Sequence, residues 1–358
     1  MAISVMLKPA SSNCNLACEY CFYHSLSLER KEYSKGMMSI ETAQRVIKSA
    51  LDFAKGEDVY FTFQGGEPLL RGLDFFESFA DFVKKNNNQG SKIHYCLQTN
   101  ATLLDDATAC FLAESGFLVG VSLDGDKDMN KYRVYPDGKS SFEQVMAGIE
   151  LLKKHKVTFN ILSVLTKNTA KNFKTAYRFF KENDLRYLQF IPCLKPFSDN
   201  YDPSLYMSCD DYGDFLNRCF KIYFNGYMRG DYMSVRCFDN YVALAKGQNA
   251  EQCGMNGCCS TQFVVEGDGS VYPCDFYCTD EWYLGNINEM DFNSLYHSEK
   301  SVEFLKNSFI LDERCKKCPH FSLCRGGGCK RNKQSADYCT AYKNFFENNT
   351  DKLYMMGR

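Results

Sequence analysis

CNLACEYC, residues 14–21, is the stretch that decides the fold of this chain, and it follows a short apolar run at residues 3–8. Its cysteines, Cys14, Cys18 and Cys21, have the spacing C-x3-C-x2-C. Three thiolates on one short loop can hold three irons of a four-iron cluster, and the fourth iron is then left without a protein ligand. An open iron can bind a substrate or cofactor, which a fully ligated cluster cannot do. Zinc is the alternative, but it usually takes four ligands as two cysteine pairs, so the crowded loop favours a cluster.

A second motif follows the next apolar run of the chain. Gly65, Gly66 and Glu67 form a Gly-Gly-Glu segment, and Tyr20 is the aromatic residue before the last cysteine of the loop. Together with the cysteine spacing, these residues resemble the radical S-adenosylmethionine superfamily. The resemblance implies that the open iron chelates the amino and carboxylate groups of S-adenosylmethionine. It also implies that an electron from the cluster cleaves this cofactor to a 5′-deoxyadenosyl radical.

The composition is that of an ordinary globular protein. The chain has 358 residues, of which 45% are hydrophobic, and its net charge of −2 gives no sign of a nucleic-acid partner. Its 19 cysteines gather toward the two ends, which in a large chain with an odd count favours cluster binding in a reducing compartment. The N-terminus has no signal-peptide pattern, and no apolar run reaches about 18 residues. We therefore expect a cytoplasmic protein with no membrane span. Because a cluster with an open iron is oxygen-sensitive, we also expect an anaerobic host.

Short apolar runs rich in Val, Ile, Phe and Tyr alternate with amphipathic stretches, which predicts a parallel sheet with helices outside it. The predicted strands are residues 3–8, 58–63, 93–98, 117–123, 157–165 and 186–192. The predicted helices lie near residues 39–54, 74–86, 105–115, 141–155, 169–183 and 210–229. Ser39 and Asp105 are the expected starts of two of them. Six units are too few for a closed eight-fold barrel and fit the partial (β/α)6 TIM-like barrel, of class α/β, that the resemblance implies.

Polar residues stand just after the predicted strands. The cysteine loop follows the first strand, Gln64 begins the segment after the second, and Gln98 ends the third. Ser122 and Asp124 close the fourth strand. Any one of these could be an ordinary turn. Because the carboxyl ends of barrel strands form the active face, we expect the group as a whole to mark the active site.

Beyond residue 235 the alternation stops and cysteines crowd together, so we divide the chain into a barrel at 1–235 and a second domain at 236–358. Residues 261–273, TQFVVEGDGSVYP, alternate around a Gly-Asp-Gly turn and predict a β-hairpin. Such a hairpin would bring Cys274 back beside Cys259. The glycines of CRGGGC would let the backbone pass close to a bulky cofactor.

This C-terminal region resembles the SPASM domain, with a β-hairpin and short helices, and the resemblance implies two auxiliary four-iron clusters. The implied ligands of the first cluster are Cys253, Cys259, Cys274 and Cys329. Those of the second are Cys315, Cys318, Cys324 and Cys339. From the sequence alone, Cys258 competes with its neighbour Cys259, and two zinc sites are the alternative because C-x2-C pairs also suit zinc. Fully ligated clusters would serve electron transfer or scaffolding.

Seven other cysteines have no partner at ligand spacing, so we predict that they are small buried side chains. They are Cys96, Cys110, Cys193, Cys209, Cys219, Cys237 and Cys278.

Longer strings resemble the anaerobic sulfatase-maturating enzymes from about residue 3 to 345. They are LKPASSNCNLACEYCFYH, FTFQGGEPLL, CLQTNATLL, VGVSLDG and FVVEGDGSVYPCDFY. The resemblance implies a radical oxidoreductase that converts a cysteine or serine of a sulfatase to Cα-formylglycine. In that reaction the 5′-deoxyadenosyl radical takes a hydrogen atom from Cβ, and the auxiliary clusters accept electrons.

The same resemblance implies the cofactors, partners and site residues. The cofactors are three [4Fe-4S] clusters and S-adenosyl-L-methionine; the partners are an unfolded sulfatase segment with a Cys/Ser-x-Pro/Ala-x-Arg motif and a flavodoxin- or ferredoxin-type electron donor. Asp275 would be the catalytic acid–base residue, although an aspartate after a hairpin can also be a turn or helix cap. The implied S-adenosylmethionine contacts are Tyr20, Gly65, Gly66, Glu67, Ser122, Asp124, Arg133 and Leu194. Tyr23, His24, Gln64 and Gln98 are expected to contact the peptide.

Two other functions are compatible with parts of this sequence. A maturase of another ribosomal peptide, such as one that forms thioether crosslinks, shares the barrel and the auxiliary clusters but usually has an N-terminal domain that grips a leader peptide. The predicted first strand at residue 3 leads us to expect no such domain. A non-catalytic iron–sulfur electron carrier would have fully ligated clusters and would form no 5′-deoxyadenosine.

Overall fold

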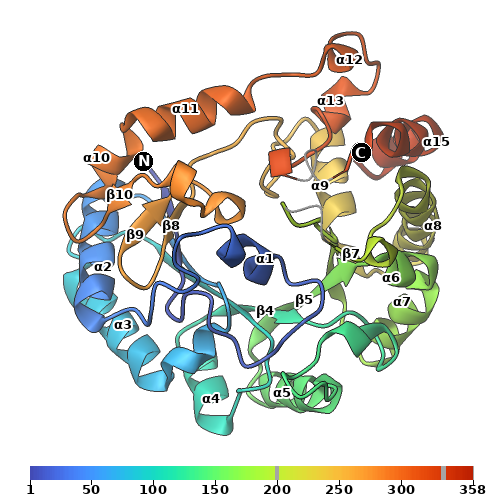
Figure 1. The fold of residues 1–358 in the computed structure, drawn as a ribbon. Helices are drawn as coiled ribbons and strands as arrows, with labels where there is room; N and C mark the ends of the chain where they lie inside the picture. Colours follow the sequence, from blue (N-terminus) through green and yellow to red (C-terminus); the bar gives the residue numbers. More distant parts are fainter. Residues whose placement is uncertain (198–200, 332–335, 358) are drawn as a thin grey trace. The chain divides into compact units, whose positions relative to one another are not determined.

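A computed structural model describes residues 1–197, 201–331 and 336–357 (Figure 1). The chain forms two compact units that interleave along the sequence. Unit 1 comprises Met1–Ser122, Tyr132–Phe159 and Thr261–Phe304. Unit 2 comprises Leu123–Lys131, Asn160–Ser260 and Leu305–Arg358. These units group residues by spatial contact, whereas the predicted division at residue 235 rests on a change in the sequence pattern, and it stays a prediction.

The strands of unit 1 follow the order β10-β9-β8-β1-β2-β3-β4. Four of them are parallel neighbours: β1 (Ile3–Leu7), β2 (Val59–Phe63), β3 (Ile93–Thr99) and β4 (Leu118–Ser122). On its other side β1 pairs, again in parallel, with β8 (Phe263–Val265), so that Val5 lies opposite Phe61 and Phe263. The antiparallel β9 (Ser270–Tyr272) and β10 (Gly285–Asn286) complete the edge. The sheet is therefore mixed, with a parallel centre.

Helices α2 (Ile40–Ala54), α3 (Leu73–Asn86) and α4 (Asp106–Glu114) lie on the outer side of these strands (Figure 1). Alternate strand residues are buried, and the rings of Phe61 and Phe63 each meet that of Phe79 at 5.0 Å. This packing of an apolar strand face on an apolar helix stripe is what the two sequence periodicities predict. The helix α5 (Phe142–Lys154) also belongs to unit 1.

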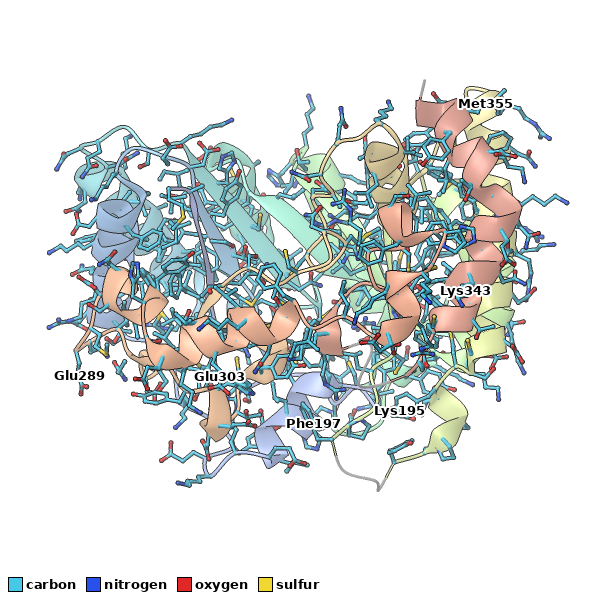
Figure 2. All side chains as sticks on the ribbon, turned by 90° about the horizontal axis from the view of Figure 1, so that it is seen from above. Lys195, Phe197, Glu289, Glu303, Lys343 and Met355 are labelled. Atoms are coloured by element: carbon cyan, nitrogen blue, oxygen red, sulfur yellow. The ribbon has the colours of Figure 1, made fainter. Side chains whose placement is uncertain are left out.

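In unit 2, β6 (Tyr187–Pro192) is parallel to β5 (Thr158–Leu165) and to β7 (Ser234–Val235). The long helix α15 (Cys339–Gly357) packs against α8 (Cys209–Met228) and α9 (Arg236–Ala245). Aromatic rings fill this helical interface, with Phe345 at 5.4 Å from Phe220 and 5.7 Å from Phe238. Lys343 and Met355 lie toward the two ends of α15 (Figure 2).

The remaining elements are short. The helices are α1 (Phe22–Leu28), α6 (Lys167–Lys171), α7 (Phe173–Glu182), α10 (Phe292–Tyr296), α11 (Glu299–Ser308), α12 (Glu313–Lys316) and α13 (Phe321–Cys324). The 3-10 turns are η1 (Pro68–Arg71), η2 (Met129–Tyr132), η3 (Pro203–Leu205), η4 (Asp275–Tyr277) and η5 (Asp280–Trp282). Within the described ranges, no helix is long and apolar enough to cross a membrane.

The six predicted strands and the hairpin are confirmed, and so are the two predicted helix starts. The Ser39 hydroxyl accepts the Thr42 N–H, and the Asp105 carboxylate accepts the Thr108 N–H at 2.8 Å. The helix expected at 169–183 is instead two helices, α6 and α7, which meet at Asn172. The prediction of buried cysteines is correct for Cys193, Cys219 and Cys278 and wrong for four that are only partly buried. These four are Cys96, Cys110, Cys209 and Cys237.

We predict opposite effects of alanine at two helical glycines. A Cβ at Gly148 of α5 would lie 2.3 Å from the carbonyl oxygen of Ala101, so Gly148→Ala should lower the free energy of unfolding by about 1–3 kcal/mol. A Cβ at Gly213 of α8 would lie 3.4 Å from Ala341, an ordinary contact, so Gly213→Ala should raise stability by about 0.5–1 kcal/mol. Thermal unfolding of variants with equal iron content measures both. An unchanged midpoint for Gly148→Ala would contradict the close packing of α5.

Candidate active site

Backbone hydrogen bonds join the loop that follows β1 to the loop that follows β2. The backbone N–H of Gly66 donates to the Ser11 carbonyl, and that of Glu67 donates to the Asn13 carbonyl, both at 2.8 Å. A Cβ at Gly66 would lie 1.9 Å from the Asn13 carbonyl oxygen, so only glycine permits this approach. The N–H of Gly66 is thus engaged, and the amino group of a ligand, itself a donor, would require carbonyl oxygens at this edge.

The other end of the cysteine loop packs on residues 132–134. The N–H of Ala17 donates to the Val134 carbonyl at 2.7 Å. The Tyr20 ring lies edge-on to Tyr132, with centroids 6.2 Å apart, and the Arg133 guanidinium carbon is 5.4 Å from the Tyr20 centroid. Two residues predicted from the resemblance, Tyr20 and Arg133, are therefore brought together beside the cysteines.

The Glu67 carboxylate is buried and faces away from open space. Its Oε1 accepts from the Thr99 hydroxyl at 2.8 Å and the Leu69 N–H at 3.1 Å, and its Oε2 accepts from the Asn100 N–H at 2.8 Å. Burial raises the pKa of Glu67 to about 7, although these hydrogen bonds act in the opposite direction. The carboxylate thus ties the Gly-Gly-Glu segment to the end of β3, and a cofactor contact at Glu67 would come from its backbone.

Asn100, which ends the polar string 98–100 after the third predicted strand, lies beside the cysteine loop. Its side-chain amide lies 3.8 Å from the Cys14 sulfur and donates to the Asn15 side chain at 2.9 Å. Burial raises the pKa of the Cys14 thiol to about 12. Since metal ligation requires the thiolate, iron binding would release this proton. The QTN string at 98–100, just after β3, was the available signal for Asn100.

The predicted residues after β4 and β6 fall into both units. In unit 1, the Gln98 side-chain amide donates to the Ser122 hydroxyl at 3.0 Å. In unit 2, Asp124 is buried and accepts the Val164 N–H at 2.8 Å, which joins the residues after β4 to β5. Leu194 is buried just after β6. The placing of Asp124 and Leu194 at the cofactor site stays a prediction.

Asp275, in the turn η4, lies among side chains from the loops after β1 and β2. Its Oδ2 accepts from the Tyr23 hydroxyl at 2.5 Å and from the Gln64 amide at 3.4 Å. Its Oδ1 lies 2.9 Å from the Lys8 ammonium. Burial, followed by the charge of Asp275, raises the pKa of Tyr23 well above its ordinary value, so Tyr23 stays a donor. Asp275, Tyr23 and Gln64, which the sequence predicted separately, thus form one constellation.

Two buried ion pairs stand behind Asp275, and the sequence analysis did not single out their members. Glu266 Oε1 lies 2.8 Å from Arg30 and 3.5 Å from Lys8. Burial acts to raise the pKa of Glu266, but the charges of Lys8 and Arg30 outweigh it and lower that pKa. His24, by contrast, is exposed and lies 3.0 Å from the Tyr33 hydroxyl, outside the Asp275 group.

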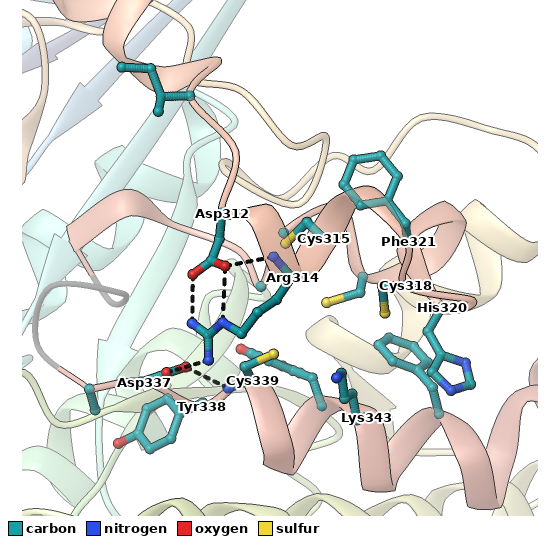
Figure 3. A pocket seen from close by; sticks show the side chains of 17 residues that line it. Asp312, Arg314, Cys315, Cys318, His320, Phe321, Asp337, Tyr338, Cys339 and Lys343 are labelled. Carbon is teal, nitrogen blue, oxygen red and sulfur yellow. Dashed lines mark hydrogen bonds and ion pairs between the residues drawn. The ribbon is translucent and has the colours of Figure 1, made fainter.

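Four cysteines of unit 2 line one cavity of about 310 Å³. They are the residues predicted for the second auxiliary cluster: Cys315, Cys318, Cys324 and Cys339. Figure 3 shows Cys315, Cys318 and Cys339 directed into this space. Arg314 closes part of the rim through ion pairs to Asp312 at 2.7 Å and Asp337 at 2.8 Å (Figure 3). Four thiols around a cavity of this size fit a four-iron cluster.

Three further cysteines of unit 2 lie close together. Burial and then the neighbouring Cys329 and Cys259 raise the pKa of Cys253 to about 11. A Cβ at Gly254 would lie 2.8 Å from the Cys329 nitrogen, so the two segments touch. These three are predicted ligands of the first auxiliary cluster, and the fourth, Cys274, belongs to unit 1.

Within the described residues, no three His, Cys, Asp or Glu side chains are grouped as tightly as ligands of a single metal ion.

Comparisons with known proteins agree with this arrangement. Residues 9–180 match the Radical SAM superfamily, and residues 253–319 match an iron-sulfur cluster-binding domain. A protein of Clostridium perfringens (strain 13 / Type A) named cysteine-type anaerobic sulfatase-maturating enzyme is 46% identical over 354 residues, which cover 96% of this chain and 95% of that protein. The chain belongs to the anaerobic sulfatase-maturating enzyme family. It is therefore a radical S-adenosylmethionine oxidoreductase with iron–sulfur clusters.

Two other relatives bear on specificity. A protein of Bacteroides thetaiotaomicron named serine-type anaerobic sulfatase-maturating enzyme is 33% identical over 371 residues, covering 96% of this chain and 88% of that protein. The solved structure of native anSMEcpe with bound AdoMet and Cp18Cys peptide has 43% sequence identity and a TM-score of 0.94, and it covers 100% of this chain and 99% of that one.

Iron content should distinguish Cys258 from Cys259. Burial and then the charge of Cys329 raise the pKa of Cys259. Besides burial and Cys329, the charge of Cys259 raises the pKa of Cys253 more than the charge of Cys258 does, which indicates that Cys259 is the nearer of the two. Cys259→Ala should therefore bind about four irons fewer per chain, whereas Cys258→Ala should keep the full content. Anaerobic iron and sulfide analysis after reconstitution measures this, with Cys209→Ala as a control outside the predicted ligands. The reverse pattern would assign the ligand to Cys258.

Proposed function

We propose that this protein oxidises a cysteine in a sulfatase segment to Cα-formylglycine. The observation that carries the proposal is the Asp275 carboxylate, held by Tyr23 and Gln64 next to the three-cysteine loop. The preference for cysteine is supported by the higher identity to the cysteine-type relative than to the serine-type relative.

The chemistry can be divided between the cofactors and the chain. When bound, S-adenosylmethionine and a cluster held by Cys14, Cys18 and Cys21 would supply the radical that removes one hydrogen atom from Cβ of the target cysteine. Asp275 accepts the thiol proton. An auxiliary cluster, held by the predicted ligand cysteines, would take up one electron, so that the side chain loses two electrons in all and becomes a thioaldehyde. Water then replaces sulfur, which leaves as hydrogen sulfide. Tyr23 and Gln64 fix the carboxylate oxygen that they contact.

The site assignment extends this proposal. We infer a radical S-adenosylmethionine core at 1–235 and a cluster-binding domain at 236–358, which the matches at 9–180 and 253–319 support. The loop cysteines would hold the open cluster, and the eight C-terminal ligands would hold two closed ones. Contacts to S-adenosylmethionine would come from the residues predicted above, with Tyr20 and Arg133 already paired beside the loop.

The partners follow from the same chemistry. The substrate would be an unfolded sulfatase segment with a Cys-x-Pro-x-Arg motif, since the target side chain must reach the buried Asp275. The reductant would be a low-potential flavodoxin or ferredoxin. We place the protein in the cytoplasm, because cluster thiolates require a reducing compartment.

The test is an anaerobic assay of the reconstituted protein with S-adenosylmethionine, reductant and a peptide carrying Cys-x-Pro-x-Arg. We expect a mass change from thiol to aldehyde with formation of 5′-deoxyadenosine. Asp275→Asn should lower peptide oxidation by about 100-fold or more, because the proton acceptor is lost. Asp280→Asn, at an exposed aspartate of the next turn, is the matched control. Deoxyadenosine without peptide oxidation, for both cysteine and serine peptides, would overturn the assigned substrate.

A further inference from the structure

We propose that Lys8 is a positioning residue for the reaction, which fixes the Asp275 carboxylate, and that Glu266 and Arg30 hold Lys8 in place. The inference rests on the proposed role of Asp275 as proton acceptor. It concerns side chains of unit 1 to which the sequence analysis assigned no role.

Lys8 is 1% exposed and stands directly after β1. Its ammonium lies 2.9 Å from Asp275 Oδ1, 3.5 Å from Glu266 Oε1 and 4.7 Å from the centroid of the Tyr23 ring. A fully buried ammonium is costly unless it is paired, so this lysine cannot turn elsewhere without losing its partners. Its position is thus fixed by the same groups that surround the proposed proton acceptor.

Lys8 is placed to orient Asp275, which begins the short turn η4. Tyr23 and Gln64 contact only Oδ2, and Lys8 is the group at Oδ1. Lys8 approaches Oδ1 as an ion pair. With one oxygen held on each side, the carboxylate has a defined plane, and the target thiol meets it in one orientation.

The backbone explains why Lys8 and Glu266 meet. Leu7 and Val265 are paired across the parallel strands β1 and β8, and the Lys8 N–H donates to the Val265 carbonyl at 2.8 Å. The residues that follow, Lys8 and Glu266, therefore leave their strands at the same level. Arg30 approaches from the segment after α1, pairs with Glu266 Oε1 at 2.8 Å and also donates to the Cys278 carbonyl.

The buried cluster is electrically neutral, which suggests a competing explanation for Lys8. Two cations, Lys8 and Arg30, face two carboxylates, Glu266 and Asp275, and all four side chains are buried. Lys8 could then serve only to neutralise Glu266 and Asp275 so that unit 1 folds. The two explanations differ in what happens when neutrality is restored without Lys8.

The experiment compares Lys8→Met, Lys8→Arg and the charge-balanced double variant Lys8→Met/Glu266→Gln in the holoenzyme. Lys35→Met is the control, since Lys35 also pairs with acidic side chains in unit 1 but lies near the surface. Steady-state assays with the cysteine peptide give kcat and KM, and the ratio of 5′-deoxyadenosine formed to peptide oxidised gives the coupling.

A positioning role predicts that Lys8→Met lowers kcat by about 10- to 100-fold with little change in KM, because a misplaced acceptor costs turnover and not binding. More deoxyadenosine should form per peptide oxidised. Lys8→Arg should recover part of kcat, and the double variant should stay slow. In an Asp275→Asn background, Lys8→Met should add no further loss, since the two residues act as a unit.

Full turnover of the charge-balanced double variant would overturn the inference and leave charge neutralisation as the role of Lys8. Should Lys8→Met fail to fold, the double variant and Lys8→Arg carry the test. A different result would overturn the proposed function: full peptide oxidation by the Asp275→Asn variant. If Asp275→Asn loses peptide oxidation but a folded Lys8 variant keeps its kcat and its coupling, only the inference about Lys8 is overturned.

Discussion

The pairing of β1 with both β2 and β8 is the constraint on which the active site of unit 1 depends. Parallel strands send their carboxyl ends to one edge. The cysteine loop after β1, the Gly-Gly-Glu segment after β2 and Glu266 after β8 consequently leave the sheet side by side. Asp275, in the turn after β9, joins these loops through its contacts with Tyr23, Gln64 and Lys8. A segment more than 250 residues from the cysteine loop in sequence thereby joins the same site.

Burial determines how charge is used at this edge. The Glu67 carboxylate accepts hydrogen bonds from a hydroxyl and a backbone N–H at the end of β3. The Asp275 carboxylate instead contacts side chains. Buried ion pairs such as Arg30–Glu266 add little net stability, because the loss of hydration offsets their attraction. Their main effect is on orientation, since each side chain fixes the next along the series of contacts from Arg30 to Asp275.

Much of this could be predicted from the sequence, because its signals are local. Strand and helix periods gave the barrel units, and the cysteine spacing with the family resemblance gave the ligands and Asp275. Lys8, Arg30 and Glu266 could not be found in this way, because their roles arise from the register of β1 with β8. The break at Asn172, between α6 and α7, was hidden because the amphipathic pattern continues across it. Asn100 was within reach, since its string follows β3.

The most direct test is an anaerobic crystal structure of this protein with its clusters, S-adenosylmethionine and a cysteine peptide bound. The account predicts that the target thiol lies within hydrogen-bond reach of Asp275, at about 3 Å, while Lys8 remains at the other carboxylate oxygen. A target cysteine out of reach of Asp275, with another side chain of the protein at its thiol, would contradict the account.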